Sequence, residues 1–166
     1  MPFPKPRSQA FPHYLAFEKL NQSNFFTKLN LKFEQQEELA GERADFVCPN
    51  ISYVSNQKHN SMVLECQTTL KDRFRLTSGK ILNMKKIQKY LVTATGVGLY
   101  TKSDVNDLSA GKIREYLDNS DNNYFVVFSQ VKAKFLSELD SDYLTRIFSF
   151  SEFIDNYEQN QKSWET

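Results

Sequence analysis

The most informative stretch of this chain is SMVLECQTTLKDRFR, residues 61–75. Its first half, 61–67, is a short apolar run of the kind that forms a buried β-strand. Glu65 lies inside this run, where a carboxylate is costly unless it is paired or bound to a cation. The second half carries Lys71, Arg73 and Arg75 within ten residues of that acid. The stretch therefore predicts an acid-bearing strand followed directly by a cation-rich turn.

A second apolar run, ADFVC at 44–48, stops at a proline and contains another acid, Asp45. A polar loop, 55–60, separates the two runs, so we expect two neighbouring strands joined by a turn. Asp45 and Glu65, on adjacent strands, can converge on one Mg²⁺ at the sheet edge, because Mg²⁺ is typically held by one or two carboxylates with waters and phosphate oxygens. The alternative is that both carboxylates simply point outward on alternating faces.

The remaining pattern predicts an α/β domain with a mixed central sheet flanked by helices. Apolar residues at helical spacing or capping serines predict helices over 11–20, 80–89 and 103–117, and from Ser149 or Ser151 onward. Residues 25–33 are expected to hold the end of a helix and the start of a strand, and 90–95 and 124–128 are predicted strands. We expect an extended N-terminal arm over 1–10 and a single domain over 11–166.

Composition excludes several classes of protein. Of 166 residues, 40% are hydrophobic and 14% aromatic, which favours a folded chain over a disordered one. No apolar run approaches the roughly 18 residues that cross a bilayer, and no signal peptide is evident, so we expect no membrane partner. Cys48 and Cys66 fit reduced thiols of a cytoplasmic protein. With only two histidines, any divalent metal is expected to be a hard ion held by carboxylates.

The charge distribution is uneven although the net charge is only +1. Seven basic residues and one acid lie between residues 71 and 89, and seven acids lie from Glu138 to the end against two basic residues. Such polarity permits a basic face for phosphates. The alternative is that Lys85, Lys86 and Lys89 form one solvated helix face.

The segment QTTLKDRFR at 67–75 resembles the catalytic domain of EcoRII-type type II restriction endonucleases, whose pattern is Lys-Thr-Thr-x-Lys-Asp-Arg-Trp-Arg. Further matches in the same order are FEQQ at 33–36, ADF at 44–46, KYLVTAT at 89–95 and SFSEFID at 149–155, so the resemblance spans about residues 18–158. It implies a restriction-endonuclease-like PD-(D/E)xK core, Mg²⁺-dependent cleavage of both strands of a DNA site, and a homodimer. Asp45 would bind the metal.

The same segment is the predicted DNA-binding region. Arginine is the usual bidentate reader of guanine in the major groove, and lysine and threonine suit phosphates. The resemblance likewise places Arg73 and its neighbours in the region that reads base edges. The predicted DNA-contacting residues are Thr68, Thr69, Lys71, Asp72, Arg73 and Arg75.

The sequence departs from this family at two positions. Gln67 occupies the family's lysine position, and Lys80 stands thirteen residues later, where the family has its second acid. We hypothesise that Asp45 and Glu65 hold Mg²⁺, that Lys80 supplies the missing cation, and that Gln67 hydrogen-bonds the attacking water. In the alternative, Lys80 contacts only a backbone phosphate and Gln67 itself suffices.

The functional prediction is a type II site-specific deoxyribonuclease, a Mg²⁺-dependent hydrolase of double-stranded DNA with Asp45, Glu65, Gln67 and Lys80 as catalytic residues. Gln67 favours a second reading, in which the chain is a DNA-binding module or subunit on the same fold that has lost catalysis. A third reading is a repair or recombination nuclease that prefers a DNA structure over a sequence.

Overall fold

The computed structural model describes residues 30–35, 37–67, 81, 83–93 and 108–165. The predicted N-terminal arm, the helix predicted at 11–20 and most of the segment 25–33 lie outside these residues. None of the helices described combines the length and apolar composition that a membrane span needs.

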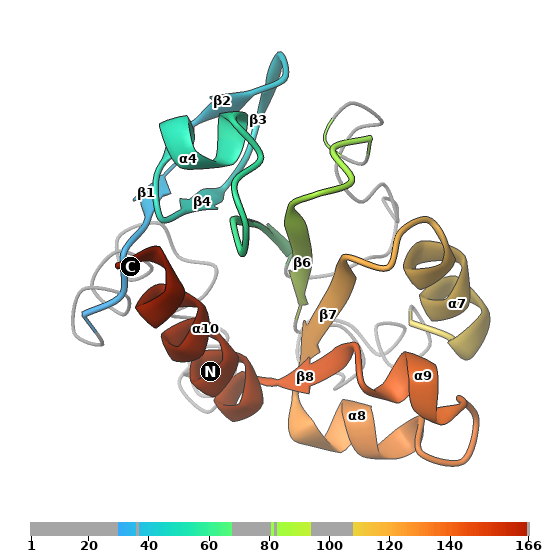
Figure 1. The fold of residues 1–166 in the computed structure, drawn as a ribbon. Coiled ribbons are helices and arrows are strands. Elements are labelled where there is room, and N and C mark those ends of the chain that lie inside the picture. Colours follow the sequence, from blue (N-terminus) through green and yellow to red (C-terminus); the bar gives the residue numbers. More distant parts are fainter. Residues whose placement is uncertain (1–29, 36, 68–80, 82, 94–107, 166) are drawn as a thin grey trace, which may run out of the picture.

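A six-stranded mixed sheet forms the centre of the molecule (Figure 1). Its strands are β1 (Glu34–Gln35), β4 (Phe46–Cys48), β5 (Met62–Gln67), β6 (Gln88–Thr93), β7 (Asn123–Val127) and β8 (Ile147–Ser149), in the spatial order β1-β4-β5-β6-β7-β8. The pairs β1–β4 and β4–β5 are antiparallel, whereas β5, β6, β7 and β8 run parallel. A separate hairpin joins β2 (Glu38–Leu39) to β3 (Glu42–Arg43).

Helices cover both faces of this sheet, so the predicted fold class is confirmed (Figure 1). The helices are α4 (Ile51–Ser55), α7 (Ala110–Asp118), α8 (Ser129–Lys134), α9 (Ser141–Leu144) and α10 (Phe150–Trp164). On one face, α10 packs Phe153 and Tyr157 against Phe46, Leu64 and Tyr90 of the strands. On the other face, α7 and α8 pack against Leu91, Phe125 and Val127.

A third apolar group, which we call the hairpin cluster, fills the second face beneath β2, β3 and α4. It lies beside the α7–α8 core and covers the β4–β5 end of the sheet. Its buried members are Leu39, Ala44, Val47, Val54, Val63, Ile81 and Ile87. This cluster fixes the hairpin over the two strands that carry the predicted acids.

Local signals placed several elements correctly. The runs at 44–48, 61–67, 90–95 and 124–128 correspond to β4, β5, β6 and β7. The predicted cap of the last helix is also confirmed. Ser149 accepts a hydrogen bond from the Glu152 backbone, and the Glu152 carboxylate accepts one from the Ser149 backbone, which satisfies two free N–H groups at the start of α10.

Two predicted helices differ from the structure. α7 begins at Ala110 with Ser109 as its cap, so no continuous helix runs from 103 to 117; Ser103 itself lies outside the described residues. The helix predicted over 80–89 is also wrong, because residues 85–87 form a turn and β6 begins at Gln88. The spacing of Ile81 and Ile87 instead reflects their burial in the hairpin cluster.

The lysines of this segment do not form one solvated helix face. Lys85 and Lys86 are exposed in a turn, whereas Lys89 is only 1% exposed within β6. The Lys89 Nζ donates a hydrogen bond of 3.0 Å to the Met84 backbone carbonyl. Burial, with the nearby charge of Lys85, lowers the pKa of Lys89 to about 8. Lys89 is therefore a structural side chain of the sheet.

Candidate active site

The antiparallel register of β4 and β5 brings Asp45 next to Glu65. Phe46 pairs with Leu64 and Val47 with Val63, so the register carried back by one residue sets Asp45 beside Glu65. Val47 and Val63 both point into the hairpin cluster. Because side chains alternate along a strand, Glu65 lies on the same face of β5 as Val63, and Asp45 stands opposite it in a bend directly before β4.

A backbone hydrogen bond holds Asp45 against β5. The Asp45 Oδ2 accepts a bond of 2.8 Å from the N–H of Cys66, the residue directly after Glu65. A hydrogen bond to a carboxylate is stronger than one between neutral groups, so it restricts where this side chain can lie. Asp45 and Glu65 are both half-buried.

Glu65 is hard to ionise in this position. Its burial raises its pKa to about 8, with additional contributions from the negative charges of Asp45 and Glu42. Near neutral pH, the metal-free Glu65 therefore retains its proton. A bound divalent cation would reverse this balance, since an adjacent positive charge favours the carboxylate form.

Gln67 continues the same face at the end of β5. It is half-buried, and it pairs in register with Thr93 of β6, just as Glu65 pairs with Leu91. Thr93 is fully buried. The strand therefore carries a neutral amide on the same face as Glu65, two residues beyond it.

Glu42, on β3 and three residues before Asp45, is not among the predicted site residues. Its only sequence signal is alternation: Glu42 and the buried Ala44 fall on the same side of an extended segment, whereas Arg43 between them is exposed. Strands of two residues are too short for this alternation to stand out in a sequence.

The other predicted site residues lie outside the described residues. They are Lys80 and the DNA-contacting set Thr68, Thr69, Lys71, Asp72, Arg73 and Arg75. Their roles stay predictions. Within the described ranges, no three histidine, cysteine or acidic side chains lie close enough together to hold a metal ion by themselves.

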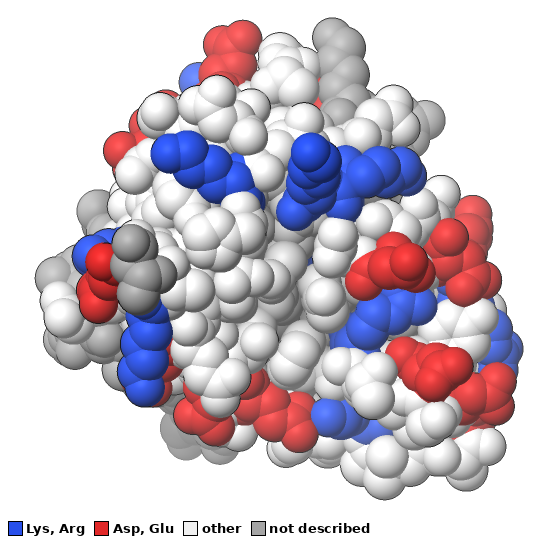
Figure 2. Space-filling model, viewed as in Figure 1, with Lys and Arg blue, Asp and Glu red and all other residues white. Residues whose placement is uncertain are grey.

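Charge is unevenly distributed over the surface. Figure 2 shows basic side chains across the upper part of one face and acidic side chains gathered to the right, over the region of α7 and α9. Lys58, Lys85 and Lys86 are among the exposed basic residues that the structure describes.

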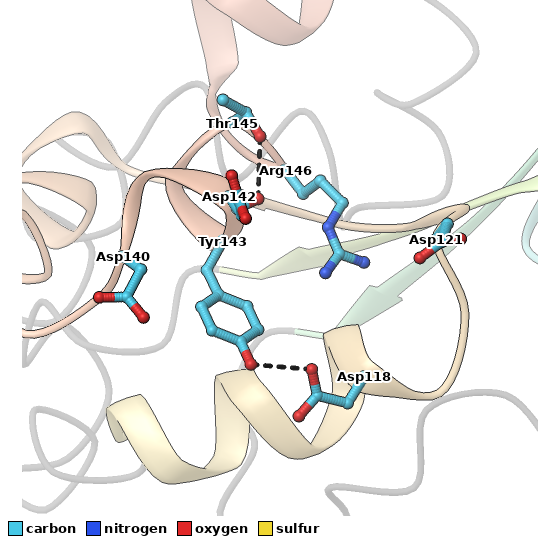
Figure 3. A pocket seen from close by; sticks show the side chains of 7 residues that line it. All are labelled: Asp118, Asp121, Asp140, Asp142, Tyr143, Thr145 and Arg146. Atoms are coloured by element: carbon cyan, nitrogen blue, oxygen red, sulfur yellow. Dashed lines mark hydrogen bonds between the residues drawn. The ribbon is translucent and has the colours of Figure 1, made fainter.

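An acidic pocket of about 560 Å³ lies beside α9, away from the two carboxylates (Figure 3). Its lining residues are Asp118, Asp121, Asp140, Asp142, Tyr143, Thr145 and Arg146. Several of them stand just before β7 and β8, at the amino ends of the parallel strands, whereas Glu65 lies toward the carboxyl end of β5.

The polar groups of this pocket hold the local fold together. The Tyr143 hydroxyl donates to Asp118 at 2.9 Å (Figure 3). Arg146 donates to the backbone carbonyls of Leu117 and Ser120 at the end of α7. A cation that binds the last carbonyls of a helix stabilises the helix end. The pocket is thus explained by packing of α7 against α9.

Comparison with solved structures identifies the fold. The chain superimposes on the restriction endonuclease PspGI in a complex with substrate DNA with a TM-score of 0.68 and 15% identity, covering 94% of this chain and 66% of PspGI. It superimposes on metal-depleted Ecl18kI in complexes with uncleaved modified DNA (TM-score 0.65, 17% identity) and with uncleaved DNA (0.63, 18%). Each of these covers 88% of this chain and 44% of the Ecl18kI chain.

Sequence comparison adds no relative, since no family model and no curated protein sequence matches the chain. At these low identities the structural likeness establishes the fold alone. The sheet order, the flanking helices and the superpositions agree, and the chain has the fold of restriction endonucleases.

Proposed function

We propose that this chain is a Mg²⁺-dependent endonuclease that hydrolyses double-stranded DNA at a specific site. The observation that supports the proposal is the proximity of Asp45, directly before β4, to Glu65 on β5. Burying one carboxylate beside another is unfavourable unless a cation compensates them. Solved complexes of PspGI and Ecl18kI, which share the fold, contain DNA, which supports DNA as the substrate.

The donor set fits Mg²⁺. Both acids supply hard carboxylate oxygens, and Mg²⁺ prefers such oxygens from one or two side chains, with its other positions left for water and phosphate. The raised pKa of Glu65 also fits, because that carboxyl ionises readily only when a positive charge is added. When bound, the ion would polarise a phosphate oxygen and neutralise charge that develops during hydrolysis.

The remaining residues would position the reactants. In the proposed reaction, a water oxygen forms a bond to phosphorus, the bond to the leaving sugar oxygen breaks, and that oxygen takes up a proton. Gln67 would hydrogen-bond the attacking water from the strand, and Lys80 would supply the positive charge that the family's lysine provides. The segment with Thr68, Lys71 and Arg73 would hold the DNA backbone and read base edges.

A homodimer is part of the proposal. A site-specific enzyme that cuts both strands of DNA needs one active centre for each strand, and a twofold dimer matches a palindromic or pseudo-palindromic site. Asp45 and Glu65 of one copy would form one such centre. The oligomeric state on DNA is measurable by light scattering of the complex.

Incubation with a sequenced supercoiled plasmid, with and without Mg²⁺, tests the proposed activity. We expect discrete Mg²⁺-dependent fragments from the native chain and none from Asp45→Asn. Asp155→Asn is the matched control, because Asp155 is exposed on α10, and this variant should cut normally. Cleavage by Asp45→Asn at the native rate would refute the proposed role of the acid pair.

Gln67 favours one alternative function, a DNA-binding module that has lost catalysis. A neutral amide at the family's lysine position leaves the strand without a cation beside the reacting phosphate. The same experiment decides, since retarded but intact DNA in the presence of Mg²⁺ supports the binding module. If the chain is such a binding module, we expect the substitution Gln67→Lys to restore cleavage.

A further inference from the structure

The β2–β3 hairpin turns one acid inward and another outward. Leu39 pairs with Glu42 across the hairpin, and Glu38 pairs with Arg43. Leu39 is buried, whereas Glu38 and Arg43 are exposed, so the Leu39–Glu42 pair lies on the inner side. The turn between the strands uses Ala40 and Gly41, both with positive φ, as expected for a tight two-residue hairpin.

The inner side of this hairpin faces the acid pair. Leu39 and Ala44 belong to the hairpin cluster. Val47 and Val63 belong to it as well, and they lie two positions from Asp45 and Glu65 respectively. The charge of Glu42 also contributes to the raised pKa of Glu65. Glu42 therefore lies near Glu65, although Glu42, Asp45 and Glu65 are not close enough together to hold an ion directly.

One oxygen of Glu42 is buried without a partner. Its Oε2 has less than 1 Å² of accessible surface and no hydrogen-bond partner among the described residues. A buried polar atom that lacks a donor costs free energy, and such atoms in folded proteins usually meet a water or an ion. The orphaned oxygen therefore indicates a further group at this site.

We propose that Glu42 is a third carboxylate of the site and that it holds the divalent cation through a water molecule. The inference rests on the proposed function, because it needs a cation at Asp45 and Glu65. We place the contact through water because the described residues contain no three acidic side chains close enough together to hold an ion directly. Mg²⁺ retains several waters in protein sites, and residues that hold those waters orient the inner ligands.

Binding of Mn²⁺ to the metal-free chain, without DNA, tests this role. Mn²⁺ prefers the same oxygen ligands as Mg²⁺, and electron paramagnetic resonance measures the free ion directly. We expect Glu42→Gln to weaken Mn²⁺ binding by about 10–100-fold, the usual effect of losing an outer-shell partner. The matched control is Glu38→Gln, which removes the same charge from the outward side of the hairpin and should bind Mn²⁺ like the native chain.

The thermal midpoint of the metal-free variants separates a metal-holding role from a structural one. Glu42→Gln removes the charge of a carboxylate that has an unpartnered buried oxygen. The thermal midpoint of this variant in EDTA should therefore equal or exceed that of the native chain, while its Mn²⁺ affinity falls. Native affinity in Glu42→Gln, with Asp45→Asn unable to bind, would overturn the role of Glu42 and leave the proposed function standing. A native chain that binds no Mn²⁺, or binds it equally well as Asp45→Asn, would overturn both proposals.

Discussion

Replacing Glu65 with glutamine should make the metal-free protein more stable at alkaline pH. Glutamine keeps the shape of the side chain but cannot ionise. In the native chain, the unfolded state releases the Glu65 proton near the ordinary pKa of 4.5, whereas the folded state holds it up to about 8. The contribution of Glu65 to the free energy of unfolding is therefore greatest below pH 4.5. It falls as the pH rises from 4.5 toward 8 and stays low above pH 8.

The size of the effect follows from the two pKa values. Each tenfold change in the acid constant corresponds to about 1.4 kcal/mol, so the shift sets a ceiling of about 5 kcal/mol. Glu65 is only partly buried, and solvent screening reduces the value. We expect Glu65→Gln to gain about 2–4 kcal/mol relative to the native chain between pH 4.5 and pH 9.

Urea unfolding in EDTA at several pH values measures this gain. The quantity to compare is the difference in free energy of unfolding between variant and native chain at each pH, because other titrating groups cancel in it. Glu158→Gln, at an exposed position on α10, is the control and should show no such trend. A constant difference for Glu65→Gln from pH 4.5 to pH 9 would refute the account of a strained buried carboxyl.

Three further predictions test separate parts of the structure. Lys80→Ala should abolish cleavage in the plasmid assay while gel retardation of DNA persists; full cleavage would disprove its catalytic role. Ser149→Ala should cost about 1 kcal/mol of unfolding free energy by chemical denaturation, because it removes the cap of α10, and a loss below 0.3 kcal/mol would contradict it. Lys89→Met should raise the free energy of unfolding by about 2 kcal/mol more at pH 7 than at pH 10.5, because the cost of burying the charged amine disappears as the pH rises above its lowered pKa. Equal effects at both pH values would contradict this prediction.

The strands and the last helix were predictable because their signals are local. The runs that became β4, β5, β6 and β7 are apolar and bounded by polar residues, and a capping serine precedes α10. The helix predicted over 80–89 failed for a tertiary reason. Ile81 and Ile87 are spaced as on a helix, but they reach the hairpin cluster from either side of a turn.

The proximity of Asp45 and Glu65 was also predictable, but the inward position of Glu42 was not. Asp45 and Glu65 each stand out as a charge inside an apolar run, and the neighbouring strands follow from the short connection between them. Glu42 stands in a polar stretch, GER, where an acid is unremarkable in sequence. Only the pairing of Glu42 with buried Leu39 reveals that it points inward.

The position of the acid within β5 has a physical consequence for the whole site. Relative to the resembling family, a carboxylate stands at Glu65 and an amide at Gln67, so this face of the strand carries negative charge without a lysine to balance it. Asp45 and Glu42 add to that charge, as the raised pKa of Glu65 reflects. In the proposed function, a divalent cation bound at Asp45 and Glu65 would compensate this charge. Binding of that cation would then be coupled to the ionisation of Glu65, so it would stabilise the fold locally and set the charge that a DNA phosphate meets.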